Sequence, residues 1–182
     1  MHAILVSLAL VFALPSLAQT SAPRGRPMHE MQGDCANFGT DLTREFALWG
    51  QPPLSIDVRP QETEGSAPLP AKRRIALRLV PNDAIRFAVP PGENRGAPDR
   101  FGGTVQLAPL SAGLWRVSAS NGAWLDITTD RSLLDAPSFE MQTKCDRIFK
   151  SVTYRVTDGH RLFLQVNGSR TETIGLLLTL VR

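Results

Sequence analysis

The strongest constraint on the fold is a two-residue alternation of apolar and polar side chains that recurs through most of the chain. In one run Trp115, Val117 and Ala119 share a face, and polar residues occupy the positions between them. Turn sequences such as Asn121-Gly122 separate these runs at intervals of about 8–12 residues. The pattern predicts an all-β fold, an antiparallel β-sandwich of jelly-roll type with about eight or nine strands.

One short helix is expected on the N-terminal side of this sandwich, over residues 42–49. Asp41 can cap it, and Leu42, Phe46 and Trp49 fall on one face at helical spacing. The glycine and the two prolines that follow end the helix.

The first 18 residues have the pattern of a cleavable signal peptide. An apolar run precedes Pro15, and Ser16-Leu17-Ala18 supplies small residues for cleavage. No Lys or Arg precedes the run, so a buried N-terminal helix or strand is the alternative. We expect a periplasmic or secreted protein with no transmembrane segment after signal removal.

The rest of the chain divides into two parts. Residues 19–33 are punctuated by Pro and Gly and predict a flexible N-terminal arm. Residues 34–182 contain no linker or internal repeat, and they are long enough to form a single β-sandwich domain.

The charge pattern does not suggest a nucleic-acid partner. The formal net charge is +3, and the basic residues are spread along the chain. The only clusters are Arg-Gly-Arg at 24–26 and Lys72-Arg73-Arg74, and the simplest interpretation of each is a solvated loop.

Two cysteines, Cys35 and Cys145, are expected to form a disulfide in an oxidising compartment. A metal site or a reactive thiol is the alternative, but the chain has no Cys-x-x-Cys and no nearby pair of histidines. We therefore predict no metal and no other cofactor.

Two resemblances to known groups of proteins bear on the fold and on export. The strand rhythm from Gly103 onward, with Gly-Leu-Trp-Arg-Val-Ser at 113–118 and Trp-Leu-Asp-Ile at 124–127, resembles the pre-peptidase C-terminal β-sandwich modules of secreted enzymes. Cys35, Asp-Leu-Thr-Arg-Glu-Phe at 41–46, Phe-Ala-Val-Pro-Pro-Gly at 87–92 and Cys145 are similar to a group of small exported proteobacterial proteins of unassigned function. That similarity implies export, paired cysteines and a compact β fold, and it implies no activity.

Trp124 and Asp126 are the first candidates for a ligand-binding site. They lie on the opposite strand face from Leu125 and Ile127. An aromatic ring beside a carboxylate on an open sheet face suits a sugar or a peptide, and Arg116 is a further candidate. The alternative is that Trp124 is buried and Asp126 bonds a loop.

Other conspicuous side chains have structural interpretations. Trp49, Trp115 and Tyr154 are predicted to lie in the core. Lys150 shares a strand face with Tyr154, so its ammonium must reach the rim or pair with an acid, and Glu45 is the expected partner in a structural ion pair.

The sequence contains no nucleophile with a matched base and no Gly-x-Ser-x-Gly elbow. We therefore expect an exported non-enzymatic module that binds a ligand or an envelope protein. The alternatives are a structural protein of the envelope, a small hydrolase, or a hydrolase inhibitor that uses the loop over residues 90–103.

Overall fold

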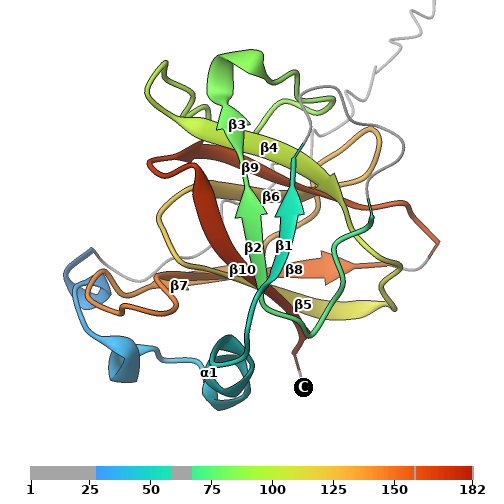
Figure 1. The fold of residues 1–182 in the computed structure, drawn as a ribbon. Helices are drawn as coiled ribbons and strands as arrows, with labels where there is room; N and C mark the ends of the chain where they lie inside the picture. Colours follow the sequence, from blue (N-terminus) through green and yellow to red (C-terminus); the bar gives the residue numbers. More distant parts are fainter. Residues whose placement is uncertain (1–27, 59–66, 158, 182) are drawn as a thin grey trace, which may run out of the picture.

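The computed structural model of the protein describes residues 28–58, 67–157 and 159–181 (Figure 1). The predicted signal peptide, residues 1–18, lies outside the described residues. The described residues contain ten strands, which form two sheets of six and four strands.

The larger sheet has the strand order β1-β2-β10-β5-β8-β7. Its strands are β1 (Leu54–Asp57), β2 (Ile75–Arg78), β10 (Thr173–Leu180), β5 (Gly113–Ala119), β8 (Lys150–Val156) and β7 (Ser138–Met141). The β1–β2 pair is parallel, and the other pairs are antiparallel.

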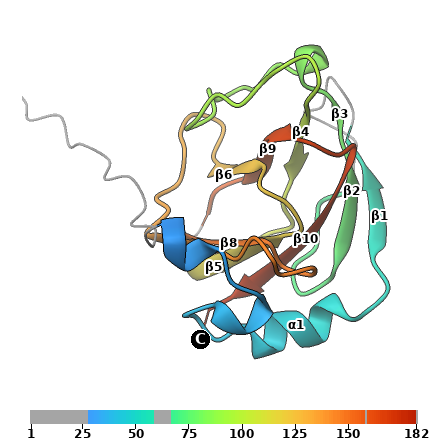
Figure 2. The same cartoon turned by 90° about the vertical axis from the view of Figure 1, so that its left-hand side faces the viewer.

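The smaller sheet has the order β3-β4-β9-β6 and is antiparallel throughout. Its strands are β3 (Val80–Pro81), β4 (Phe101–Gln106), β9 (Phe163–Ser169) and β6 (Trp124–Thr128). The chain crosses between the sheets repeatedly, for example from β5 to β6 and from β9 to β10. Figure 2 shows the smaller sheet facing the larger one, which confirms the predicted β-sandwich.

The main core fills the space between the sheets. The alternating apolar residues of the larger sheet, such as Leu77, Val117 and Leu178, meet those of the smaller sheet, such as Leu125 and Leu164. Each fully buried aliphatic side chain contributes about 1.5–3 kcal/mol relative to exposure, so the alternation determines which strand faces turn inward. Trp115 and Tyr154 belong to this core, as predicted.

Helix α1 (Thr43–Trp49) covers the outer face of the larger sheet (Figure 2). Leu42 and Trp49 pack there with Ile148 and Leu177 in a second apolar cluster. Asp41 Oδ1 accepts a hydrogen bond from the Thr43 amide at 2.9 Å, and this bond lowers the pKa of the Asp41 carboxyl. The predicted helix is therefore confirmed, and Trp49 is buried as expected. None of the helices in the described residues could cross a membrane.

The described part of the chain also contains three short 3-10 helices. They are η1 (Met28–Met31), η2 (Cys35–Asn37) and η3 (Asn82–Ala84). The disulfide between Cys35 and Cys145 is present, as predicted, and it joins η2 to the loop before β8.

The N-terminal segment corrects the expected boundary of the folded domain. The side chain of Gln142 accepts from the Gly33 amide at 2.8 Å and donates to the Glu30 carbonyl at 3.0 Å. Met31 is buried, and its carbonyl accepts from the Thr143 amide. Residues 28–33 therefore belong to the folded domain, although proline and glycine spacing assigned them to a flexible arm.

The disulfide closes a long stretch of chain, so its removal should destabilise the fold. The two cysteines are 110 residues apart, and the chain-entropy model assigns such a loop roughly 4–5 kcal/mol. We expect Cys35→Ser/Cys145→Ser to lower the free energy of unfolding by that amount in urea denaturation. The oxidised wild type is the reference, and wild type kept in reductant should match the variant. Equal midpoints for the oxidised and reduced proteins would contradict this.

Candidate functional site

The outer face of the smaller sheet carries buried polar side chains. On β6 and β9, Leu125 and Val166 point into the core, whereas Asp126 lies opposite Gln165, and Trp124 lies opposite Asn167. Asp126, Gln165 and Asn167 are only 8%, 1% and 1% exposed. Another part of the chain must cover this face.

The cover is residues 82–98 of the long connection between β3 and β4, which we call the pinned loop. Asp126 Oδ2 accepts from the Gly92 amide at 3.0 Å. Gln165 Nε2 donates to the carbonyl of Val89 at 3.1 Å, and Asn167 Nδ2 donates to the carbonyl of Glu93 at 2.9 Å. Three neighbouring side chains of one sheet face therefore each bond the backbone of the loop.

The two ends of the pinned loop are also fixed. At one end, Asn82 Nδ2 donates to Asn167 Oδ1 at 3.1 Å, and Asn82 Oδ1 accepts from the Gly168 amide at 3.2 Å. At the other end, Arg95 Nη1 donates to the Gly122 carbonyl at 3.2 Å. The loop is thus tied to β9 and to the turn before β6.

Glycine at position 168 allows the close approach of the loop. Gly168 has φ +74°, and a Cβ there would lie 2.5 Å from Arg95 Cβ and 2.6 Å from the Arg95 carbonyl oxygen. An L side chain would therefore be strained in this conformation and would also displace the loop.

Trp124 lies half-buried at the edge of this face. Its indole Nε1 donates to Asp126 Oδ2 at 3.0 Å. The Arg95 guanidinium carbon and Lys150 Nζ each lie 5.2 Å from the ring centroid, within the range of a cation–π contact. Trp124 and Asp126 thus lie together on the strand face that the alternation predicted, and their polar groups are engaged within the protein.

Lys150 reaches this site from the other sheet. Its ammonium donates to the Ala123 carbonyl at 3.0 Å, and the side chain is buried. Burial lowers the pKa of Lys150 to about 8, and the charge of Arg95 acts in the same direction, while the charges of Asp126 and Glu93 oppose it.

The free edge of β6 is closed by donors from outside its sheet. Lys150 bonds the carbonyl of Ala123, the Tyr154 hydroxyl donates to the Leu125 carbonyl at 2.6 Å, and the Leu134 amide donates to the Ile127 carbonyl at 2.8 Å. Burial raises the pKa of Tyr154 well above its usual value, which favours the protonated hydroxyl that donates this bond. The bonds from Lys150 and Tyr154 of the larger sheet therefore join the two sheets along the edge of β6.

Asp126 is the acid at the centre of the site. Burial raises the pKa of its carboxyl, while the hydrogen bonds from the Gly92 amide and the Trp124 indole act in the opposite direction. Its Oδ2 atom is used twice, by the loop and by the indole. The carboxylate therefore positions the pinned loop and Trp124 together.

The predicted ion pair and the predicted role of Arg116 are both wrong. Glu45 accepts from Arg116 Nη1 at 2.9 Å and from Thr179 Oγ1 at 2.6 Å, and both Glu45 and Arg116 are buried. Helix α1 lies on the outer face of the larger sheet, whereas Lys150 points from the inner face. Arg116 therefore pairs with the helix and is not part of the Trp124 site.

Sequence reasoning missed Asn82, Gln165 and Asn167, which fix the loop. Gln165 and Asn167 alternate with the core residues of β9, a pattern that also fits a solvated sheet face. The only sequence signal for a contact between the loop and this sheet face was the length of the connection after Pro90. A connection of that length had to lie over some surface of the sandwich.

Searches against protein-family models, curated proteins and solved structures found no match to this chain. Both resemblances noted from the sequence therefore remain predictions.

The lowered pKa of Lys150 predicts a rise in stability at alkaline pH. The unfolded chain keeps this proton up to about pH 10.5, whereas the folded protein loses it near pH 8, so unfolding takes up a proton between these values. Raising the pH from 7 to 10 should therefore add about 2 kcal/mol to the free energy of unfolding through this group.

Lys150→Met is the matched variant because it retains the length of the side chain and removes the titration. We expect the difference in unfolding free energy between wild type and Lys150→Met to grow in favour of the wild type from pH 7 to 10 in urea titrations. A difference that stays constant over this range would show that Lys150 titrates normally in the folded state.

Proposed function

We propose that the protein is an exported, non-enzymatic β-sandwich module that binds a protein partner through the pinned loop. The observation that carries this proposal is the set of hydrogen bonds from Asp126, Gln165 and Asn167 to the backbone of that loop. A loop held in one conformation loses less entropy when a partner binds it.

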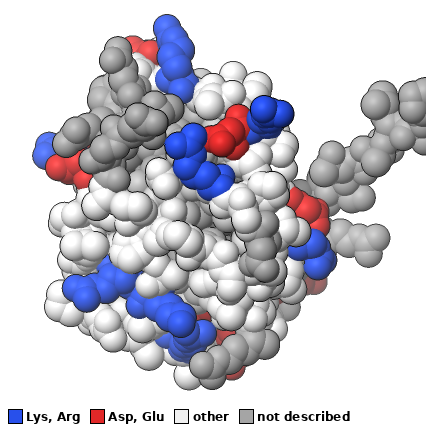
Figure 3. Space-filling model, turned by 90° about the vertical axis from the view of Figure 1, so that its right-hand side faces the viewer, with Lys and Arg blue, Asp and Glu red and all other residues white. Residues whose placement is uncertain are grey.

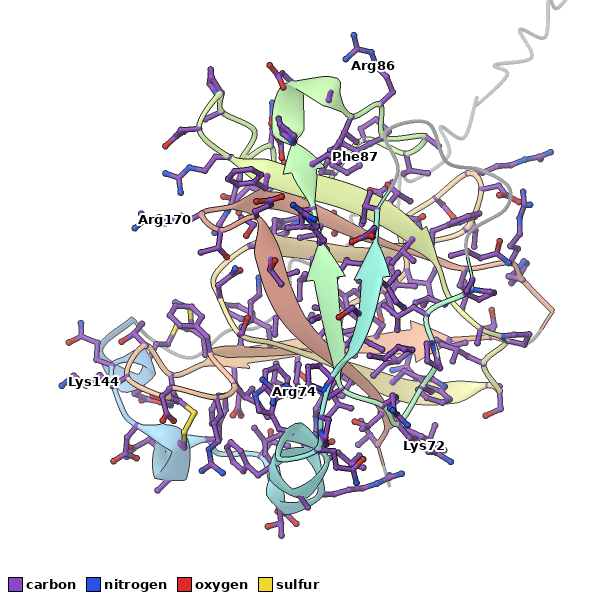
Figure 4. The ribbon with its side chains drawn as sticks, viewed as in Figure 1. Lys72, Arg74, Arg86, Phe87, Lys144 and Arg170 are labelled. Atoms are coloured by element: carbon purple, nitrogen blue, oxygen red, sulfur yellow. A yellow bond between two sulfur atoms is a disulfide. The ribbon has the colours of Figure 1, made fainter. Side chains whose placement is uncertain are left out.

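The side chains of the pinned loop support a protein partner. Arg86 and Pro90 are exposed, and Phe87 is half-buried. Figure 4 shows Arg86 pointing away from the sandwich, with Phe87 at the same end of the molecule. Arg and aromatic residues are enriched among the residues that dominate protein–protein binding.

The contacts of Trp124 favour a role in supporting the pinned loop over a role in an open sugar-binding surface. The indole N–H is bonded to Asp126, and two cations lie beside the ring. In this proposal, Trp124 and Asp126 support the contact loop from beneath. The geometry also suits a hydrolase inhibitor, which needs a rigid loop, and the identity of the partner decides between these roles.

Site-specific photo-crosslinking tests the proposal. A benzophenone amino acid at position 87 should give a discrete adduct with a partner when the protein is produced in its own organism. Adding Asp126→Ala should reduce that adduct at least fivefold, because the Gly92 amide and the Trp124 indole lose their shared acceptor.

Asp130→Ala is the matched control, because Asp130 is exposed and pairs with Arg161 on the surface. It should leave the adduct at the wild-type level. The proposal fails if position 87 gives no discrete adduct, or if a probe at the exposed Ser55 of β1 gives the same adduct.

A further inference from the structure

We infer that the end of the molecule around the C-terminus of α1 is a docking surface for anionic lipid headgroups. The surface consists of Arg44, Lys72, Arg73, Arg74 and Leu54, and we call it the basic end. It lies outside the pinned loop, and the inference does not depend on the proposed function.

Among the residues that the structure describes, the cations of the basic end have no acidic partner, unlike most of the other arginines. Arg78, Arg95, Arg100, Arg147, Arg155 and Arg161 each lie within 4.0 Å of a surface carboxylate. Within the described ranges, no carboxylate lies within that distance of the four cations of the basic end. Four positive charges therefore lie at this end without an ion pair to any described carboxylate.

Hydrogen bonds to β10 place Arg44 and Lys72 at one end of the sandwich. Arg44 Nη1 donates to the Leu180 carbonyl at 3.3 Å, and the Lys72 amide donates to the Leu178 carbonyl at 2.7 Å. Figure 4 shows Lys72 and Arg74 beside α1, and Figure 3 shows Lys and Arg side chains gathered at the lower end of the molecule.

Two arginines of the basic end, Arg44 and Arg74, are held in position by hydrogen bonds to backbone carbonyls. Arg74 Nη1 donates to the carbonyl of Trp49 at 2.9 Å, and its guanidinium carbon lies 5.4 Å from the centroid of the Trp49 ring. Guanidinium groups fixed in this way can present their remaining donors to phosphate oxygens.

Lys72 has an uncommon backbone conformation. Its φ is +60°, and it is the only non-glycine residue with positive φ in the described part of the chain. Glycine would adopt this conformation without strain, so the turn keeps a cation at a position where the backbone favours glycine.

An exposed apolar residue distinguishes a lipid surface from a purely acidic partner. Leu54 is 41% exposed, and its amide donates to the Arg74 carbonyl at 2.9 Å, so it lies directly beside the cations. The prolines at 52 and 53 are also exposed. Cations beside exposed apolar side chains match an anionic headgroup layer with hydrocarbon beneath it.

Vesicle co-sedimentation tests the inference. The protein without residues 1–18, the predicted signal peptide, should sediment with vesicles of phosphatidylglycerol and phosphatidylcholine at low salt, and 0.5 M salt should release it because surface charges are screened. Lys72→Glu/Arg73→Glu should weaken binding by about tenfold or more. Leu54→Ser should weaken binding without changing its salt dependence.

Lys144→Glu/Arg170→Glu is the matched control, because it makes the same change in net charge at exposed positions away from the basic end (Figure 4). It should bind as the wild type does. The inference is overturned if both double variants lose binding equally, if the wild type does not sediment with these vesicles, or if it binds soluble polyglutamate and not the vesicles. Thermal unfolding of each variant shows whether a loss of binding comes from loss of the fold.

Discussion

The arrangement of the site depends on the need to pair buried polar groups on the outer face of β6 and β9. Asp126, Gln165 and Asn167 are almost fully removed from solvent. A buried polar group without a hydrogen bond costs about 1–3 kcal/mol, so these side chains require partners. The backbone of the pinned loop supplies one hydrogen bond to each of them, while Gln165 Oε1 has no partner among the described residues. The loop is therefore part of the fold, although it contains little regular structure.

A second constraint acts at the free edge of β6. An edge strand presents unpaired carbonyls that can pair with other chains. Here Lys150 and Tyr154 cross from the larger sheet to bond Ala123 and Leu125. The same ammonium contacts the ring of Trp124, so the edge that joins the sheets also fixes the side chain that lies beside the pinned loop.

The period-two pattern predicted the sandwich, the inward strand faces and the shared face of Trp124 and Asp126, because side-chain alternation depends only on local backbone geometry. Capping and helical spacing predicted α1, and the compartment suggested by the N-terminal sequence predicted the disulfide. Each of these features follows from short-range sequence information or from cysteine count.

The incorrect predictions concern which part of the chain packs over each strand face. Glu45 was assigned to Lys150 because alternation gives the face of a strand but not the layer above it. Arg116 was added to the Trp124 site for the same reason. Residues 28–33 were assigned to an arm because the bonds from Gln142, more than 100 residues away, have no local signal.

Amide hydrogen exchange at Gly92 measures whether the pinned loop is fixed to the sheet, since this N–H is bonded to Asp126 beneath the loop. We predict that Gly92 exchanges at least about 100-fold more slowly than an unstructured glycine, because the loop must detach from the sheet before exchange can occur. Exchange of Gly92 at the unprotected rate, while the amides of β9 remain protected, would show that the loop is not fixed to the sheet.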